Sequence, residues 1–148
     1  MILYFAYGAN LSKESMKYRC PDATPIQPIE LRDWALAFAD HATIVPAPGE
    51  SVQGGIWAIT KQCERSLDMF EGYPVYYTKE TLEQDGLKFM VYIMNPPLYG
   101  NPSAGYVNII RQGYNDWNLD QAQLDYALTN NQKGIHEWDH QQLYTNFI

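Results

Sequence analysis

The sequence predicts one α+β domain in which a mixed sheet closes into a small β-barrel with flanking helices. Three observations lead to this fold class. Short β-prone runs outnumber helical patterns and are bounded by Gly, Pro and Asn. The helical patterns are inserted between these strands. The chain has 148 residues, of which 46% are hydrophobic, and it shows no repeat or linker, so we expect residues 1–148 to form a single domain.

The first predicted elements are a buried strand, a tight turn and a helix. Residues 2–7 form a short apolar run rich in aromatic residues, and Gly8-Ala9-Asn10 ends it directly before a helical segment at 12–16. Such a junction leaves several backbone N–H groups unpaired at one point, which makes a ready anion or oxyanion site. An ordinary strand-to-helix connection would have the same sequence pattern.

Three strands are expected next, after a proline-punctuated link at 20–28. The alternating residues 31–39 and the apolar residues 42–45 predict two of them, the second ended by Pro46 and a Pro48-Gly49 turn. The third is predicted at 51–59. Its paired glycines, Gly54 and Gly55, indicate a bulge or the close approach of another group to the backbone.

A short helix is predicted after this strand. Thr60 is a suitable N-cap, and Cys63, Leu67 and Phe70 follow at the spacing of one buried helical face. Gly72 suits the left-handed position that ends a helix, and a proline two residues later prevents the helix from resuming.

Glu71 is the acidic residue at the end of this helix. The helix dipole is negative there, and the neighbours are apolar and aromatic, so we expect the carboxyl group to hold its proton more firmly than a free one. A general base that works near neutral pH needs a shift in this direction. The alternative is that Glu71 is an exposed residue at a frayed helix end.

The second half of the chain predicts a hairpin and two helices. Strands are expected at 76–82 and 88–94, joined by an Asp85-Gly86 turn. Helices are expected at 102–113, ending at a glycine, and at 119–128. The polar and aromatic tail, residues 129–148, is assigned no structure.

The composition excludes several classes of function. A net charge of −7 without a basic stripe argues against binding of nucleic acid. No apolar run approaches the ~18 residues of a membrane span, and the N-terminus lacks the basic flank of a signal peptide, so we expect a cytoplasmic protein that does not bind membranes. Tyrosine combines apolar area with a hydroxyl group, so the 12 tyrosines are consistent with a binding pocket that contains polar groups or, equally, with a protein–protein interface.

No metal site is predicted. Cys20 and Cys63 are too few for a disulfide scaffold and lack metal-ligand spacing. His136 and His140 are four residues apart, as two ligands on one helix face would be, but they lie in the polar tail without the HExxH context.

Three separated motifs occur in an order that resembles the γ-glutamylcyclotransferase-like family. They are Tyr4-Phe5-Ala6-Tyr7-Gly8-Ala9-Asn10-Leu11, Gly54-Gly55-Ile56-Trp57-Ala58-Ile59 and Leu67-Asp68-Met69-Phe70-Glu71-Gly72. The helix start Pro102-Ser103-Ala104-Gly105-Tyr106 and the following Arg111-Gln112-Gly113 also resemble that family. The likeness spans residues 2 to about 128, and its first and third motifs are specific when found together.

The resemblance implies a cofactor-free enzyme of the lyase or acyltransferase type that acts on a small γ-glutamyl amide. In this family the free α-amine of a γ-glutamyl group attacks its own γ-carbonyl, which gives 5-oxoproline and releases the attached amine. Carried over by position, Glu71 is the catalytic acid/base. The substrate-binding residues are Tyr7, Gly8, Ala9, Asn10 and Leu11 of the opening turn, with Tyr77 and Tyr106 lining the pocket.

Some questions stay open at this level. Ala9 stands where many members of the family have a hydroxyl residue, and the motifs resemble branches that act on different amides, so the leaving amine is not determined. Two alternatives remain: a cyclisation that removes a protecting γ-glutamyl group from a biosynthetic intermediate, and a catalytically silent module that binds a small ligand. The sequence does not determine the oligomeric state.

Overall fold

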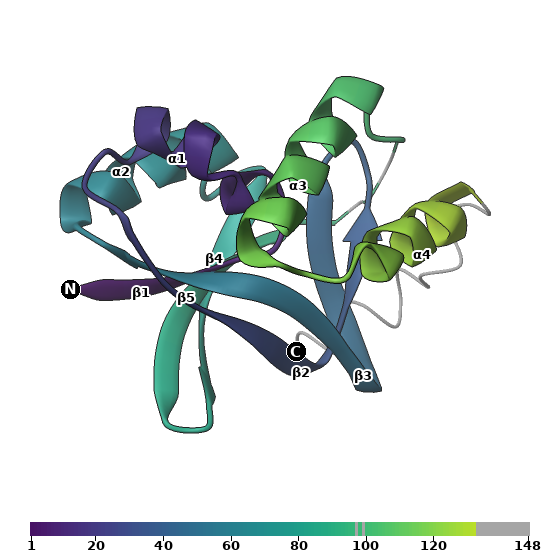
Figure 1. The fold of residues 1–148 in the computed structure, drawn as a ribbon, viewed down its shortest axis with the longest axis horizontal. Helices are drawn as coiled ribbons and strands as arrows, with labels where there is room; N and C mark the ends of the chain where they lie inside the picture. The colour runs from purple at the N-terminus through teal and green to yellow at the C-terminus, as the bar shows by residue number, and fades with distance from the viewer. Residues whose placement is uncertain (97, 99, 133–148) are drawn as a thin grey trace.

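The computed structural model describes residues 1–96, 98 and 100–132, which form a five-stranded sheet with helices packed beside it (Figure 1). The strands are β1 (Ile2–Ala6), β2 (Thr24–Phe38), β3 (Ala42–Ile59), β4 (Tyr77–Gln84) and β5 (Leu87–Met94). The helices are the 3-10 turn η1 (Ala9–Leu11), α1 (Lys13–Arg19), α2 (Lys61–Glu71), α3 (Ala104–Trp117) and α4 (Gln121–Gln132). None of the helices in these residues is long and apolar enough to cross a membrane.

The sheet is mixed, as predicted, with strand order β2-β3-β1-β5-β4. The β1–β5 pair is parallel and the other pairs are antiparallel. The α+β class is therefore confirmed, but the closed barrel is wrong, because the end strands β2 and β4 do not pair in the described part of the chain. Side chains connect these edges: Gln84 accepts from the Arg32 N–H at 2.8 Å, and its amide donates to the Glu30 carbonyl at 2.8 Å.

The two long strands extend through prolines that the sequence analysis placed in loops. β2 begins at Thr24 and therefore includes Pro25 and Pro28, which an edge strand tolerates because one row of its N–H groups faces outward. β3 continues through the predicted turn near Gly49. Its register with β2 is interrupted there, because residues 47–50 of β3 stand opposite Asp33 alone, and the Asp33 carboxylate accepts from the Gly49 N–H at 3.0 Å.

The glycines mark close packing between elements. A Cβ at Gly55 would lie 2.7 Å from the Trp117 ring, so the predicted close approach is a packing contact with α3, and the sheet has no bulge at this position. α3 does not end at Gly113, where the sequence analysis placed its end, but continues to Trp117; a Cβ at Gly113 would lie 2.6 Å from Leu11, so this glycine within the helix allows close packing.

Helices α1 and α2 lie beside each other over the end of the sheet that carries β1 (Figure 1). The predicted cap of α2 is present at both ends: the Thr60 hydroxyl accepts from the Cys63 N–H at 3.1 Å, and Gly72 is left-handed with φ 66°. A disulfide joins Cys20, the residue that ends α1, to Cys63 in the first turn of α2. The number of cysteines alone did not indicate this bridge.

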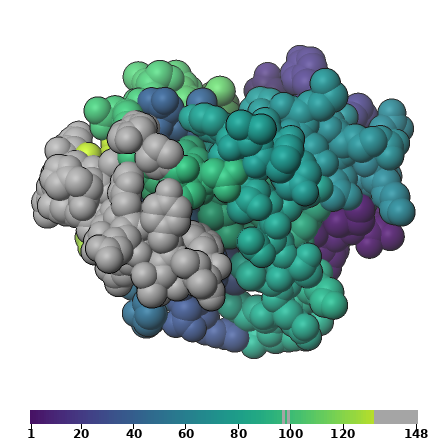
Figure 2. All heavy atoms as spheres, turned by 180° about the vertical axis from the view of Figure 1, so that it is seen from behind, coloured from purple at the N-terminus to yellow at the C-terminus, as the bar shows by residue number. Residues whose placement is uncertain are grey.

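From behind, the teal segment that contains α2, β4 and β5 makes up much of the visible face (Figure 2). Its β4–β5 hairpin turns at Asp85 and Gly86, whose φ angles of 52° and 82° are those of the predicted tight turn. The tail histidines, His136 and His140, lie outside the described residues.

Candidate active site

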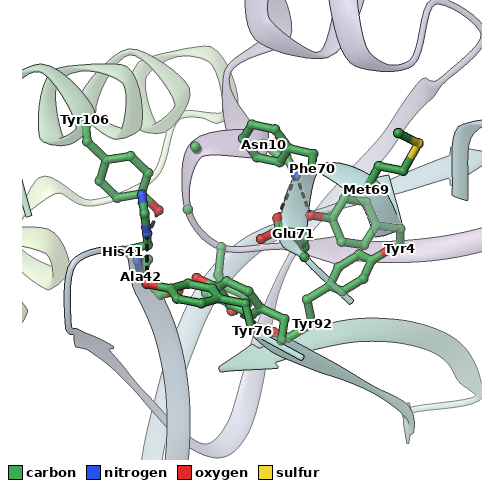
Figure 3. A pocket seen from close by; sticks show the side chains of 15 residues that line it. Tyr4, Asn10, His41, Ala42, Met69, Phe70, Glu71, Tyr76, Tyr92 and Tyr106 are labelled. Carbon is green, nitrogen blue, oxygen red and sulfur yellow. Dashed lines mark hydrogen bonds between the residues drawn. The ribbon is translucent and has the colours of Figure 1, made fainter. Parts of the chain in front are cut away.

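A cavity of about 250 Å³ opens where η1, the C-terminal end of α2, the start of β3 and the start of α3 meet (Figure 3). Segments that are far apart in the sequence contribute its walls. They are Tyr4, Tyr7, Gly8, Ala9, Asn10, His41, Ala42, Met69, Phe70, Glu71, Gly72, Tyr76, Tyr77, Tyr92 and Tyr106.

The turn after β1 forms one wall and brings main-chain donors to it. Its first hydrogen bonds run from the Leu11 N–H to the Gly8 carbonyl at 3.0 Å and from the Ser12 N–H to the Ala9 carbonyl at 3.1 Å. The N–H groups of Ala9 and Asn10 precede these donors, at the start of η1, where a helix has no internal acceptors. Since Gly8, Ala9 and Asn10 line the cavity, its wall includes the point where free main-chain donors are expected.

Glu71 faces this turn from the last residue of α2 (Figure 3). Its carboxylate Oε1 accepts a hydrogen bond from the side-chain amide of Asn10 at 3.3 Å. Burial raises the pKa of Glu71 from 4.5 to about 7, and the Arg19 guanidinium opposes this rise. The pKa of Glu71 is therefore raised in the predicted direction, and the cause is burial among the apolar and aromatic neighbours that the sequence analysis named beside the helix dipole.

Asn10 connects Glu71 to three other residues. Its Nδ2 also donates to the Tyr4 hydroxyl at 2.9 Å, while its Oδ1 accepts from Arg19 Nη1 at 2.9 Å. Its carbonyl oxygen accepts from the Trp57 indole at 3.0 Å. The residue is only 3% exposed, so these bonds are shielded from water and fix its side chain.

The cavity tyrosines differ in what their hydroxyl groups already bind. Tyr7 donates to the Tyr92 carbonyl at 2.6 Å, and Tyr77 donates to the Ala42 carbonyl at 2.6 Å. The Tyr106 hydroxyl instead accepts from the Ala42 N–H at 3.0 Å. Tyr4 likewise accepts, from Asn10. Tyr4 and Tyr106 therefore retain a hydroxyl proton that can be donated into the cavity, and burial raises the pKa of both above the usual value, which keeps that proton in place.

The mouth of the cavity is apolar and exposed. Met69 is 85%, Phe70 48% and Tyr76 42% exposed, and all three line the opening. His41 completes this rim, with its ring 5.0 Å from that of Tyr106 and 5.9 Å from that of Tyr76. A small molecule could thus bind with one polar end near Glu71 and the other end at this rim.

The structure brings together all but one of the predicted site residues. The exception is Leu11, which does not line the cavity: its side chain is completely buried and packs against α3, because the tight turn η1 directs it to the core side. The helix prediction also counted Phe70 among the buried face of α2, whereas it lies at the rim.

Sequence reasoning missed several cavity residues. They are Tyr4, His41, Ala42, Met69, Phe70, Gly72, Tyr76 and Tyr92. Tyr4 lies three residues before Tyr7, the first residue of the predicted binding turn, and could have been inferred from the alternation of β1, since its hydroxyl accepts a hydrogen bond from Asn10. His41 and Ala42 have no local signal, because the fold of β3 brings them to the site.

The arrangement has the parts needed to move a proton beside a bound carbonyl group. A carboxyl group with a pKa near neutrality can both accept and give a proton at neutral pH. Main-chain N–H groups and two tyrosine hydroxyls can stabilise negative charge on an oxygen. The described residues contain no cluster of three or more His, Cys, Asp or Glu that could hold a metal ion.

Comparisons with known proteins give one consistent family. The family described as gamma-glutamyl cyclotransferase, AIG2-like, matches residues 4–119. The chain is similar to a Bos taurus protein named gamma-glutamylcyclotransferase, at 31% identity over 89% of this chain and 81% of that protein. A Homo sapiens protein of the same name is 33% identical over 75% of this chain and 69% of that protein. A solved structure named gamma-glutamyl cyclotransferase superposes with a TM-score of 0.74 at 30% identity, covering 85% of this chain and 83% of that one.

Proposed function

Because the chain belongs to the gamma-glutamyl cyclotransferase, AIG2-like family, we propose that it is a γ-glutamylcyclotransferase that converts a small γ-glutamyl amide to 5-oxoproline and a free amine. The observation that carries the proposal is Glu71, a carboxyl group with a pKa near 7 that faces the Gly8–Asn10 turn across one cavity. Related proteins with this name support the reaction type.

In the proposed reaction, Glu71 moves one proton from the nucleophile to the leaving group. The substrate α-ammonium gives a proton to the Glu71 carboxylate, and the freed amine attacks the γ-carbonyl carbon of the same molecule. A C–N bond forms in the new ring, and the amide C–N bond breaks as Glu71 returns the proton to the departing nitrogen. The ring nitrogen then gives up its second proton, which the released amine takes to become an ammonium, so that the lactam keeps a single N–H and Glu71 is again a carboxylate. The step consumes no water, and no cofactor is needed for its balance. General acid–base assistance of this kind contributes about 10²–10⁴-fold.

The cavity walls supply the rest of the catalysis. Since the nucleophile is part of the substrate, the site has only to hold the folded-back conformer and stabilise the oxyanion. The amides of the η1 turn and the retained protons of Tyr4 and Tyr106 are the donors available for these tasks. Tyr7 and Tyr77 contribute only the shape of the cavity wall, because their hydroxyl protons are already donated to main-chain carbonyl groups.

The leaving amine would lie at the rim formed by Met69, Phe70, Tyr76 and His41. This places the part of the substrate that varies between γ-glutamyl amides against the exposed part of the site. We expect the protein to work in the cytoplasm, where small γ-glutamyl metabolites would reach the open mouth of the cavity.

The test is release of 5-oxoproline from a panel of γ-glutamyl amides that carry apolar, polar and charged leaving amines. We expect turnover of at least one class by the wild type, and loss of turnover with retained ligand binding in Glu71→Gln. Binding of the panel without any turnover would assign the chain to the silent binding module. Equal turnover in Glu71→Gln would remove Glu71 as the proton carrier.

A further inference from the structure

Arg19 contacts Asn10, which binds the Glu71 carboxylate, and Phe70, which directly precedes Glu71 in α2. It lies in the last turn of α1, and its Nη1 donates to Asn10 Oδ1 at 2.9 Å. Its Cζ lies 3.7 Å from the centre of the Phe70 ring, in a cation–π contact with the residue directly before Glu71. Asn10 in turn donates to the Glu71 carboxylate. Arg19 is therefore linked to the carboxylate through Asn10, a residue that binds it, and through Phe70, the residue next to it in the chain.

The contact with Arg19 determines which way the Asn10 amide points. A guanidinium group can only donate hydrogen bonds, so the amide atom that faces it must be the oxygen. The NH₂ group must then face the opposite side, where the Tyr4 hydroxyl and the Glu71 carboxylate lie. Without the cation the amide could rotate by half a turn, and its oxygen would then face the carboxylate and repel it.

We propose that Arg19 is a positioning residue for the cyclisation, which holds the Glu71 carboxylate in its working orientation through Asn10 and Phe70. The proposal rests on the proposed function for its catalytic consequence. The contacts themselves predict an effect on Glu71 that can be measured without turnover.

Charge gives Arg19 a second effect on the same carboxylate. The titratable groups that face Glu71 from β1, its following turn, β4, β5 and α3 are tyrosines, namely Tyr4, Tyr7, Tyr77, Tyr92 and Tyr106. Burial raises the pKa of each of these hydroxyls, so they are neutral where Glu71 titrates. His41 and Tyr76 line the rim of the same cavity. Among the residues that the structure describes, Arg19 is the cation that opposes the rise in the pKa of Glu71.

The test compares Arg19→Gln with Lys17→Gln. Both remove one positive charge from the last turn of α1, but Lys17 is exposed and lies away from Asn10 and Phe70. For Arg19→Gln we expect kcat to fall by about 10- to 100-fold, as a displaced catalytic group predicts, with KM changed by less than about twofold. We expect the rising limb of the kcat/KM pH profile to move up by about 1 pH unit. Lys17→Gln should leave both quantities at wild-type values.

A conservative variant and a direct titration separate positioning from folding. Arg19→Lys keeps a charged donor for Asn10 but loses the planar contact with Phe70, so its pH limb should stay at the wild-type position and most of kcat should return. The pKa of Glu71 should be read by NMR in wild type and Arg19→Gln. An upward shift there supports the inference even if no γ-glutamyl amide is turned over, in which case only the proposed function fails.

Two outcomes would overturn the inference. One is an Arg19→Gln variant whose kcat and pH limb both match those of Lys17→Gln. The other is a loss of activity in Arg19→Gln and Arg19→Lys that follows their loss of thermal stability, with the pKa of Glu71 unmoved in the folded protein. If Arg19→Gln does not fold, Arg19→Met takes its place, because methionine keeps an unbranched side chain over Phe70 but cannot donate to Asn10. Wild-type kcat and an unmoved pH limb in that variant would overturn the inference.

Discussion

Replacing Glu71 by Gln should make the protein more stable at neutral pH while it removes the proposed activity. Glutamine keeps the size of the side chain and an oxygen that can accept from Asn10, but it has no charge to bury. In the wild type, burial raises the pKa of Glu71 from 4.5 to about 7. At about 1.36 kcal/mol per pH unit, the buried carboxylate lowers the free energy of unfolding by roughly 3 kcal/mol at pH 8. Because the carboxylate is open to the cavity, this figure is an upper limit.

The pH dependence has a definite sign. The folded protein holds the Glu71 proton more firmly than the unfolded chain, so the unfolded chain releases it first as the pH rises. The wild type therefore loses stability between pH 4.5 and about 7, and is free of this loss below that window. The glutamine variant has no such proton and should not show this part of the decline.

Urea denaturation at pH 5 and pH 8 would measure the effect. We expect the stability difference between Glu71→Gln and wild type to grow by about 2–3 kcal/mol between these pH values, with unchanged m-values. Glu80→Gln, at an exposed position on β4, is the matched control and should keep the pH dependence of the wild type. A difference that is the same at both pH values would refute the claim that the cavity holds Glu71 at the expense of stability.

Four further predictions concern the same site and its support. For turnover, kcat/KM should rise with pH to a plateau with a midpoint near pH 7, because the carboxylate of Glu71 must be free to take the substrate proton; a flat profile from pH 5 to 8 would contradict this role. Tyr106→Phe should lower kcat/KM for 5-oxoproline release by about 10²-fold through loss of a cavity donor, and full activity would exclude that role. Gly8→Val should raise KM, since its Cβ would lie 3.1 Å from the Cβ of Ala42 and 3.5 Å from the Tyr106 hydroxyl; an unchanged KM would place the substrate elsewhere. Replacing the disulfide cysteines, 43 residues apart, with serine should lower the free energy of unfolding by about 4 kcal/mol in the chain-entropy account, and two reactive thiols in the folded wild type would show that the bond is absent.

The parts of the site that could be predicted from the sequence are those that depend on interactions between residues close together in the chain. The turn after β1 is set by Gly8 and the residues directly around it, so its unpaired amides follow from the chain itself. The end of α2 is likewise local: Thr60 caps its start, and Gly72 takes the left-handed conformation that ends it one residue after Glu71. These two segments, together with the family motifs, were sufficient to select Glu71 and the turn.

The remaining features depend on contacts between residues that are distant in the sequence. Whether the sheet closes depends on how the edges of β2 and β4 meet. β2 carries prolines and a bulge, and the Gln84 side chain, instead of a ladder of main-chain hydrogen bonds, connects it to β4. The sequence analysis took Gly113 for the end of a helix, but it lies within α3, and a glycine is needed there because Leu11 packs where a Cβ would be.

The chemistry of the cavity divides in the same way. The sequence alone determined an acid at a helix end and a cluster of main-chain donors at an early turn, since each depends on a few neighbouring residues. Only the tertiary structure decided that they face each other, that burial sets the pKa of Glu71, and that Arg19 reaches both Asn10 and Phe70. Desolvation and charge act through space, so they appear only when α1, α2 and the sheet enclose one carboxylate.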